Sequence, residues 1–136
     1  MAKVSIIGQG YVGLTIASFA ANHYRVLGFD NRNSIVDKLN LGQSHIEGVS
    51  NEELRRHLTA KSYMASSNPS DIADSEIVVI AVPTPLDSKR KPDLSYIESA
   101  CRTIGENLKN PALIINESTS FPGTVRDYIK PLVEKY

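Results

Sequence analysis

Apolar residues in this sequence of 136 residues gather in short runs, and longer amphipathic stretches separate them. Most of the runs are continuously apolar rather than alternating with polar residues, which is typical of strands that helices cover on both faces. We therefore expect buried strands at these positions. They are predicted at Lys3–Ile7, Arg25–Phe29, Ser62–Ala65, Glu76–Val82 and Ala112–Asn116.

The stretches between the runs carry apolar residues at spacings of three and four, the period of a helix with one buried face. Ser50 and Glu53 have the spacing of a capping box, which marks the start of one such helix. Pro131 is expected to kink the last helix or to end it early. Helices are predicted at 11–22, 34–41, 50–58 and 94–108 and through Val125 and Leu132, with a single turn at 69–73.

Strands that alternate with helices predict an α/β fold, a Rossmann-like doubly wound parallel sheet with helices on both faces. Because crossovers are right-handed, we expect the strand order 3-2-1-4-5, with a sixth strand of the complete fold missing. In such a sheet a ligand lies across the carboxyl ends of strands 1 and 4, where the order reverses. Residues that directly follow the strands are therefore the candidates for chemistry.

A glycine-rich turn, Gly8-Gln9-Gly10-Tyr11-Val12-Gly13, follows the first strand. A strand, a G-x-G-x-x-G turn and a helix form the first unit of a dinucleotide-binding fold. Gly8 would permit the sharp turn, Gly10 would let the backbone approach a pyrophosphate, and Gly13 would let helix and strand pack closely. The N–H groups at the start of the helix would hold the phosphate charge, aided by the helix dipole.

Asp30 ends the second strand and lies about 20 residues beyond the turn, where an acid typically binds the adenosine ribose. Its carboxylate would accept hydrogen bonds from both ribose hydroxyls and would repel a 2′-phosphate, which favours NAD over NADP. Arg32 argues in the other direction, because a nearby arginine can accommodate a 2′-phosphate. The alternative for Asp30 is a cap of the turn or helix before Asn31 and Asn33.

Two further segments would meet the groove at the ends of strands 4 and 5. Prolines on both sides of Thr84 stiffen the chain and would hold its hydroxyl beside the groove, although a plain rigid turn explains them equally well. Glu117 follows the fifth apolar run, and the hydroxyl residues after it would join it in facing a cofactor or substrate. The alternative here is that Thr119 or Ser120 only caps the last helix.

Charge and composition narrow the class of protein. The 15 basic and 15 acidic side chains cancel, and no basic block indicates nucleic-acid or membrane binding. The longest apolar run, Ile77–Val82, is too short to span a bilayer, and the first strand follows Met1 too closely for a signal peptide, so we expect a cytoplasmic protein. Cys101 lies on a helix stripe that predicts burial. With one cysteine in the sequence and no histidine that has a partner at ligand spacing, no metal site is expected. His57, on a polar helix face, is expected to be solvated.

Motifs that occur in order along the chain resemble those of the UDP-glucose/GDP-mannose dehydrogenase family, and most of all those of its UDP-N-acetylhexosamine 6-dehydrogenase branch. The resemblance covers essentially the whole chain. Its motifs are Gly8–Leu14, Gly28–Asp30, Leu39–Gly42, Val82–Leu86, Pro92–Tyr96 and Glu117–Thr119, followed by Pro122–Thr124.

The resemblance implies an enzyme that uses two NAD to oxidise the C6 hydroxyl of a nucleotide sugar, through an aldehyde-level stage, to a carboxylate. It also implies that Thr119 helps to position the hydrolytic water. Taken with the residues argued above, it gives a cofactor site made of Gly8, Gly10, Tyr11, Val12, Gly13, Asp30, Arg32, Thr84, Glu117 and Thr119.

The sequence departs from the family pattern in the second helix and in its lack of a catalytic cysteine. The family usually has a lysine or arginine early in that helix, where this sequence has Ile35, so Arg32 or Lys38 would take its place. The family's cysteine nucleophile, with its lysine and asparagine partners, has no match here, because Cys101 lies in the wrong segment.

We therefore expect residues 1–136 to be the amino-terminal NAD-binding domain alone, without the central helical and nucleotide-sugar domains. Such a chain would bind NAD but would not oxidise a UDP-sugar, which only the full-length protein, expected to be a homodimer, would bind. Two alternatives remain open. One is a stand-alone nucleotide-sensing module of the kind that regulates potassium transporters, and the other is a different two-domain NAD-dependent dehydrogenase.

Overall fold

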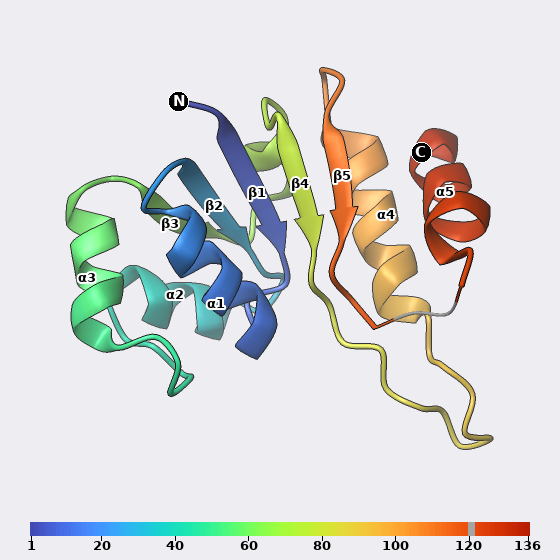
Figure 1. The fold of residues 1–136 in the computed structure, drawn as a ribbon, viewed down its shortest axis with the longest axis horizontal. Helices are drawn as coiled ribbons and strands as arrows, with labels where there is room; N and C mark the ends of the chain where they lie inside the picture. The colour runs from blue at the N-terminus through green and yellow to red at the C-terminus, as the bar shows by residue number, and fades with distance from the viewer. Residues whose placement is uncertain (120–121) are drawn as a thin grey trace.

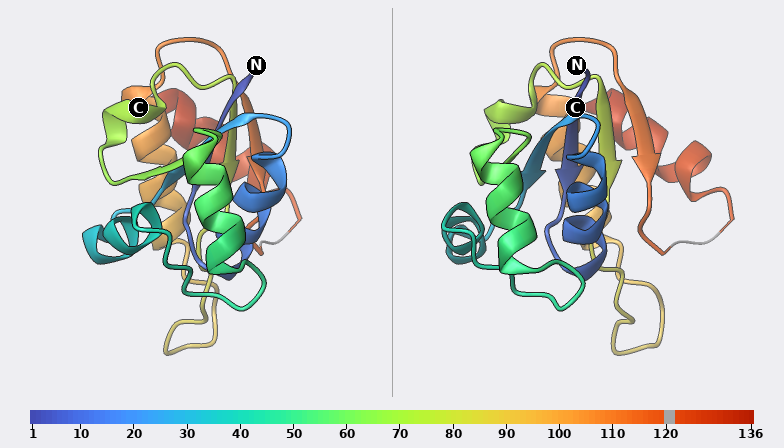
Figure 2. Two further views of the ribbon diagram at one scale, coloured as in Figure 1. Left: turned by 90° about the vertical axis from the view of Figure 1, so that its left-hand side faces the viewer. Right: turned by 60° about the vertical axis from the view of Figure 1, so that its left-hand side comes forward.

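The computed structural model describes residues 1–119 and 122–136, in which helices lie on both sides of a parallel sheet (Figures 1 and 2). The sheet has five strands in the order β3-β2-β1-β4-β5, so the α/β fold class and the topology predicted from the sequence are confirmed. The strands are β1 (Lys3–Ile7), β2 (Arg25–Phe29), β3 (Tyr63–Ser66), β4 (Ile77–Ile80) and β5 (Leu113–Asn116).

The helices differ from their predicted ranges mainly at the ends. Within the described ranges, no helix is both long enough and apolar enough to cross a membrane. The helices are α1 (Tyr11–Ala20), α2 (Asn33–Asn40), α3 (Asn51–Thr59), α4 (Ser95–Asn107) and α5 (Lys130–Lys135), with a 3₁₀ turn η1 (Pro69–Ile72) and a π-helical turn η2 (Val125–Ile129).

Successive strand residues enter two apolar cores, one on each face of the sheet. Ile6 and Val79 pack with the buried side chains of α1, α2 and α3, whereas Ile7 and Ile80 pack with those of α4 and η1. Burying one such side chain contributes about 1.5–3 kcal/mol to the free energy of unfolding. The continuously apolar runs of the sequence are thus explained, because both faces of the central strands are enclosed.

Pro131 does not end the last helix early. The π-helical turn η2 gives way to α5 at Lys130, and Pro131 lies in the first turn of α5. Ile129 and Lys130 both have helical backbone, so η2 and α5 are continuous, and the π-helical turn directly before Pro131 takes up the departure from regular α-helix geometry that a proline requires. The helix therefore continues to Lys135.

His57 is buried, and the expectation that it is solvated was wrong. Only 3% of the residue is exposed, because α3 packs this side against the start of β3. Its Nδ1 lies 3.4 Å from the hydroxyl oxygen of Ser62, and its Nε2 lies 3.9 Å from a carboxylate oxygen of Glu53. Burial and the neighbouring Arg56 lower the pKa of His57, and Glu53 opposes the shift only in part.

The segment between β4 and α4 projects below the sheet in Figure 1 as a small hairpin. Leu86 and Pro92 pair across it as an antiparallel bridge. Asp87 organises the tip, where its Oδ1 accepts hydrogen bonds from the backbone N of Lys89 at 2.8 Å and of Lys91 at 2.9 Å. The hairpin leads the chain from the end of β4 to the start of α4.

Candidate functional site

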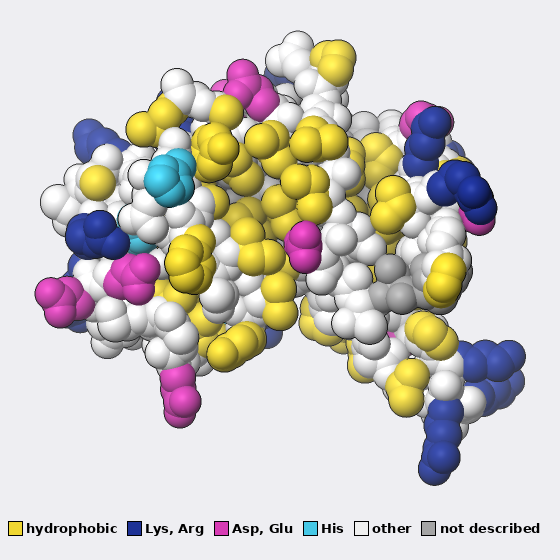
Figure 3. All heavy atoms as spheres, in the orientation of Figure 1, with side chains coloured by type: hydrophobic (Ala, Val, Ile, Leu, Met, Phe, Trp, Pro, Cys, Tyr) yellow, Lys and Arg dark blue, Asp and Glu magenta, His cyan; other side chains and the backbone are white. Residues whose placement is uncertain are grey.

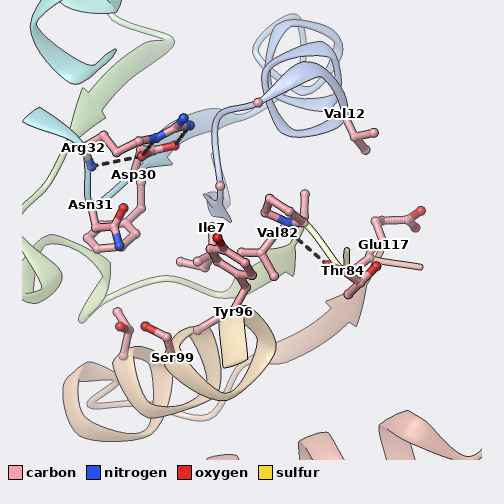
Figure 4. A pocket seen from close by; sticks show the side chains of 18 of the residues that line it. Ile7, Val12, Asp30, Asn31, Arg32, Val82, Thr84, Tyr96, Ser99 and Glu117 are labelled. Carbon is pink, nitrogen blue, oxygen red and sulfur yellow. Dashed lines mark hydrogen bonds and ion pairs between the residues drawn. The ribbon is translucent and has the colours of Figure 1, made fainter. Parts of the chain in front are cut away.

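A cleft of about 600 Å³ opens at the carboxyl ends of the strands, beside the point between β1 and β4 where the strand order reverses (Figure 4). This is the position that the sequence predicts for the ligand groove. Of the residues predicted for the cofactor site, all but Gly13 line the cleft. Those that line it are Gly8, Gly10, Tyr11, Val12, Asp30, Arg32, Thr84, Glu117 and Thr119.

The glycine-rich turn makes a sharp bend between β1 and α1. Gly8 has a φ of +97°, and a Cβ there would lie 2.5 Å from the carbonyl oxygen of Ala81, so a larger residue does not fit. A Cβ on Gly13 would lie 1.7 Å from the carbonyl oxygen of Gly8, so Gly13 lets α1 pack against the turn. A Cβ on Gly10 would meet no atom within 4 Å. The three glycines thus have different surroundings, and Gly10 alone among them has open space beside it.

The first turn of α1 has no side-chain cap. Gly10 is its N-cap residue, and no acidic residue lies in the first turn. Helix α3 shows the contrast, because Ser50 Oγ accepts a hydrogen bond of 3.0 Å from Glu53 N and two glutamates lie in the first turn. Since N–H groups at a helix start carry partial positive charge, the start of α1 can receive an anionic group from the cleft.

Asp30 lies at the end of β2 and is only 5% exposed. Its carboxylate accepts hydrogen bonds of 3.0 Å from the backbone N of Gln9, the backbone N of Arg32, and Nε and Nη2 of the Arg32 side chain. Burial acts to raise the pKa of Asp30, but the Arg32 side chain and the two backbone N–H groups outweigh burial, and the pKa is lowered. The turn-capping alternative is realised as well, because Asp30 Oδ1 accepts a hydrogen bond from the backbone N of Arg32, two residues on. Asp30 does not cap the helix, because Arg32 is the N-cap residue of α2 and that helix start has no side-chain cap.

Arg32 pairs with Asp30 at one end of the cleft, and 57% of its side chain is exposed (Figure 4). The hydrogen bonds to Asp30 raise the pKa of its guanidinium. Arg32 lines the cleft and Lys38 does not. Ile35, at the position where the family usually has a basic residue, packs partly buried against the apolar core. Of the two proposed substitutes for the basic residue, the structure therefore favours Arg32.

The ends of β4 and β5 form the opposite wall of the cleft, where Figure 4 shows Thr84 and Glu117 near each other. Thr84 is half-buried, whereas Glu117 and Thr119 are exposed. The last helix begins at Val125 with another threonine as its N-cap residue, so Thr119 does not cap it. The alternative cap, Ser120, lies outside the described residues.

Ser118, which the sequence analysis did not single out, joins the two strand ends. Its Oγ accepts a hydrogen bond of 2.9 Å from the backbone N of Val82 and lies 3.4 Å from the carbonyl oxygen of Ile80, to which the hydroxyl donates. The backbone N of Glu117 donates to the same carbonyl oxygen at 2.8 Å. These bonds fix the spacing between the segments that carry Thr84 and Glu117.

One face of α4 also lines the cleft and was missed from the sequence. Tyr96, Ser99 and Thr103 reach the cleft from this helix. Their spacings of three and four were visible in the sequence as a polar stripe beside the apolar one. The apolar stripe predicts the helix itself, whereas a polar stripe is equally typical of a solvent-exposed face.

The fold and the cleft define the class of protein. A parallel sheet with a reversal of strand order, a tight glycine turn leading into an uncapped helix start, and an acid at the end of β2 together form a Rossmann-type dinucleotide-binding domain.

The sequence assigns the family. Residues 2–136 match the NAD-binding domain of the UDP-glucose/GDP-mannose dehydrogenase family, and the chain belongs to this family. Its cofactor is therefore NAD. Because the match covers nearly the whole chain, it favours the dehydrogenase over both alternatives, the nucleotide-sensing module and the other two-domain dehydrogenase.

Similar proteins support the same family. The chain is 39% identical over 124 residues to a UDP-N-acetyl-D-mannosamine dehydrogenase from Pyrococcus horikoshii, covering 90% of this chain and 29% of that protein. A UDP-glucose dehydrogenase structure from Pyrobaculum islandicum is 33% identical with a TM-score of 0.92, covering 99% of this chain and 33% of that one.

A ternary complex of GDP-mannose dehydrogenase from Pseudomonas aeruginosa is 30% identical with a TM-score of 0.91, covering 97% of this chain and 32% of that one. This chain thus spans about a third of the length of the relatives it matches.

Proposed function

We propose that this chain is the NAD-binding part of a dehydrogenase that oxidises the C6 hydroxyl of a UDP-N-acetylhexosamine to the uronic acid. The observation that carries the proposal is that the glycine turn, the start of α1 and Asp30 line one cleft in a chain of this family. The names of relatives such as UDP-N-acetyl-D-mannosamine dehydrogenase favour an N-acetylhexosamine as the sugar.

The cleft would hold NAD in one direction. The N–H groups at the start of α1 would bind the pyrophosphate, and the Asp30 carboxylate would accept hydrogen bonds from the adenosine ribose. The nicotinamide would then lie towards Thr84, Glu117 and Thr119 on the opposite wall. When bound, NAD would supply the hydride acceptor, and a second NAD would have to replace the NADH before the second of the two oxidation steps. The Thr119 hydroxyl would help to orient the water that is consumed between these steps.

Cys101 cannot supply a nucleophile for this chemistry. It is fully buried, and burial, together with Glu98, raises the pKa of its thiol to about 11, so that it stays protonated at neutral pH. We propose that the nucleophile, the sugar-binding residues and the homodimer contacts belong to the part of the longer relatives that this chain does not span. We also propose that the protein works in the cytoplasm.

The chain alone should therefore bind NAD without oxidising a UDP-sugar. Hydride transfer needs a sugar held against the nicotinamide, and the covalent step needs an activated thiolate. The measurement is NADH absorbance with a UDP-N-acetylhexosamine as substrate, and no increase is expected. Turnover by the 136-residue chain would contradict the proposal that the nucleophile and the sugar-binding residues lie outside it.

Calorimetric titration with NAD and NADP tests the ribose role of Asp30. Wild type should bind NAD more tightly than NADP, because the carboxylate would repel the 2′-phosphate. Asp30→Ala should weaken NAD binding roughly tenfold or more, since hydrogen bonds to a charged group are lost, and should narrow the preference over NADP.

The matched control for this titration is Asp37→Ala. Asp37 is an exposed acid on α2 that does not line the cleft, so its removal changes the net charge by the same amount and should leave both affinities unchanged. Equal affinity of the wild type for NAD and NADP would refute the role given to Asp30.

A further inference from the structure

Gln9, the residue between the first two glycines of the turn, has its polar side chain fully buried. Its Nε2 donates to the carbonyl oxygen of Gly8 at 2.9 Å and to that of Ile6 at 3.3 Å. Its Oε1 accepts a hydrogen bond of 2.8 Å from the hydroxyl of Tyr63. The proposed function gives this side chain no role. Both polar atoms of the buried amide form hydrogen bonds, however, which indicates that its position matters.

The Gln9 and Tyr63 side chains meet over the middle of β2. A Cβ on Gly28 would lie 2.3 Å from Gln9 Oε1 and 2.6 Å from the Tyr63 oxygen, so the glycine makes room for their hydrogen bond. Tyr63 belongs to β3, at one edge of the sheet, and is 3% exposed. The contact therefore ties the turn after β1 to a strand two positions away.

The same residue also contacts the proposed cofactor site through its backbone. Gln9 N donates to Oδ2 of Asp30 at 3.0 Å, and Gly8 N donates to the carbonyl oxygen of Phe29 at 2.8 Å. The side chain of Gln9 thus fixes the inner side of the turn, while its N–H fixes one oxygen of the Asp30 carboxylate. A shift of Gln9 would move both the turn and this carboxylate.

We propose that Gln9 and Tyr63 are positioning residues for the cofactor. Their hydrogen bond holds the glycine turn in the conformation that aims the N–H groups of α1 and the Asp30 carboxylate at NAD. This inference rests on the proposed binding of NAD in the cleft.

The donor in this pair is the tyrosine. Burial, with the charge of Asp30 nearby, raises the pKa of Tyr63, so the phenol keeps its proton and donates it to Gln9 Oε1. Removing that hydroxyl would leave the amide oxygen buried without this donor. An unsatisfied buried acceptor is costly, and the side chain can relieve the cost only by moving, which loosens the turn.

The first test compares NAD affinity, by calorimetry well below the unfolding temperature, with thermal unfolding. Tyr63→Phe removes only the hydroxyl and should weaken NAD binding about fivefold, the size of one lost hydrogen bond. The matched control is Ser75→Ala, which removes a buried hydrogen bond of 2.6 Å between Ser75 Oγ and Ser5 Oγ on the other face of the sheet. The control should lower the unfolding temperature and leave the NAD affinity unchanged.

The second test is a double-mutant cycle with Gln9→Met, which keeps the size of the side chain. Because Tyr63 would act on the cofactor only through Gln9, the double variant should bind NAD as weakly as Gln9→Met alone. If Gln9→Met fails to fold, the comparison of Tyr63→Phe with Ser75→Ala decides the question by itself.

The outcomes separate this inference from the proposed function. NAD binding by the wild type with an unchanged affinity in Tyr63→Phe overturns the positioning role, whatever happens to the unfolding temperature. If the losses of NAD affinity add up in the double variant, Tyr63 does not act on the cofactor through Gln9. A wild-type chain that does not bind NAD overturns the proposed function and this inference together.

Discussion

At the scale of single residues, the glycines of the turn separate folding from binding. A Cβ on Gly13 would lie 1.7 Å from the carbonyl oxygen of Gly8, whereas a Cβ on Gly10 would meet no protein atom within 4 Å. The pattern G-x-G-x-x-G predicts that all three glycines matter. The structure adds that they matter for different reasons, since Gly13 is enclosed by protein and Gly10 borders the cleft.

Alanine substitutions should show this difference. Gly13→Ala is expected to lower the free energy of unfolding by roughly 1–3 kcal/mol or more, because α1 must move away from the turn. Gly10→Ala should leave the unfolding temperature nearly unchanged and weaken NAD binding about tenfold, because the added methyl would stand where the pyrophosphate approaches. Denaturant unfolding and calorimetry provide the two measurements. A loss of stability in Gly10→Ala equal to that in Gly13→Ala would contradict the assignment.

The residues that could be predicted are those whose signals are local in the sequence. Gly8 and Asp30 directly follow strands, and Thr84 lies shortly beyond the end of β4, so strand prediction placed all three near the cleft. The pair of Gln9 and Tyr63 could not be predicted, because 54 positions separate the residues and only the packing of β3 beside β2 brings them together.

At the scale of the elements, α3 shows why burial is harder to predict than helix formation. Its capping box predicted the start correctly, and the structure has Ser50 as the N-cap residue. The helix is short and rich in charged residues, so its sequence does not reveal a buried face that contains His57 as well as Leu54. A histidine beside arginine and glutamate side chains resembles a solvated residue until the contact with β3 is known.

The buried histidine on α3 should make the protein less stable in mild acid. Because the pKa of His57 is lowered in the folded state, the unfolded chain takes up the proton first, and the free energy of unfolding falls as the pH drops below about 6.5. The unfolding temperature of wild type should therefore decrease between about pH 7.5 and about pH 5.5, and His57→Gln should reduce this decrease.

The matched control for α3 is His45→Gln, which replaces an exposed histidine of the loop before the helix. This variant should keep the pH dependence of the wild type. If wild type and His57→Gln lost stability equally over the same interval, the buried histidine would not be its cause.

At the scale of the whole molecule, the sheet is enclosed unevenly. Strand β1 lies at the centre, with four of its five residues buried, whereas β5 lies at an edge and none of its four residues is fully buried. In Figure 3, apolar side chains are exposed over the face formed by α1 and the strands beside it. Among the exposed side chains are Val12, Phe19 and Leu113. The alternation of strands and helices predicted the strand order but not this difference in enclosure, which depends on where each helix packs.

The uneven enclosure means that the two walls of the cleft rest on strands with different support. Asp30 and the glycine turn follow β2 and β1, strands that are paired on both sides and mostly buried, while Glu117 and Thr119 follow the edge strand β5. Local opening costs least where few apolar contacts and only one neighbouring strand hold the backbone. A dinucleotide that spans the cleft would thus meet only doubly paired strands at its adenosine end, whereas its nicotinamide end would meet Thr84 beyond the doubly paired β4 and Glu117 and Thr119 beyond the edge strand β5.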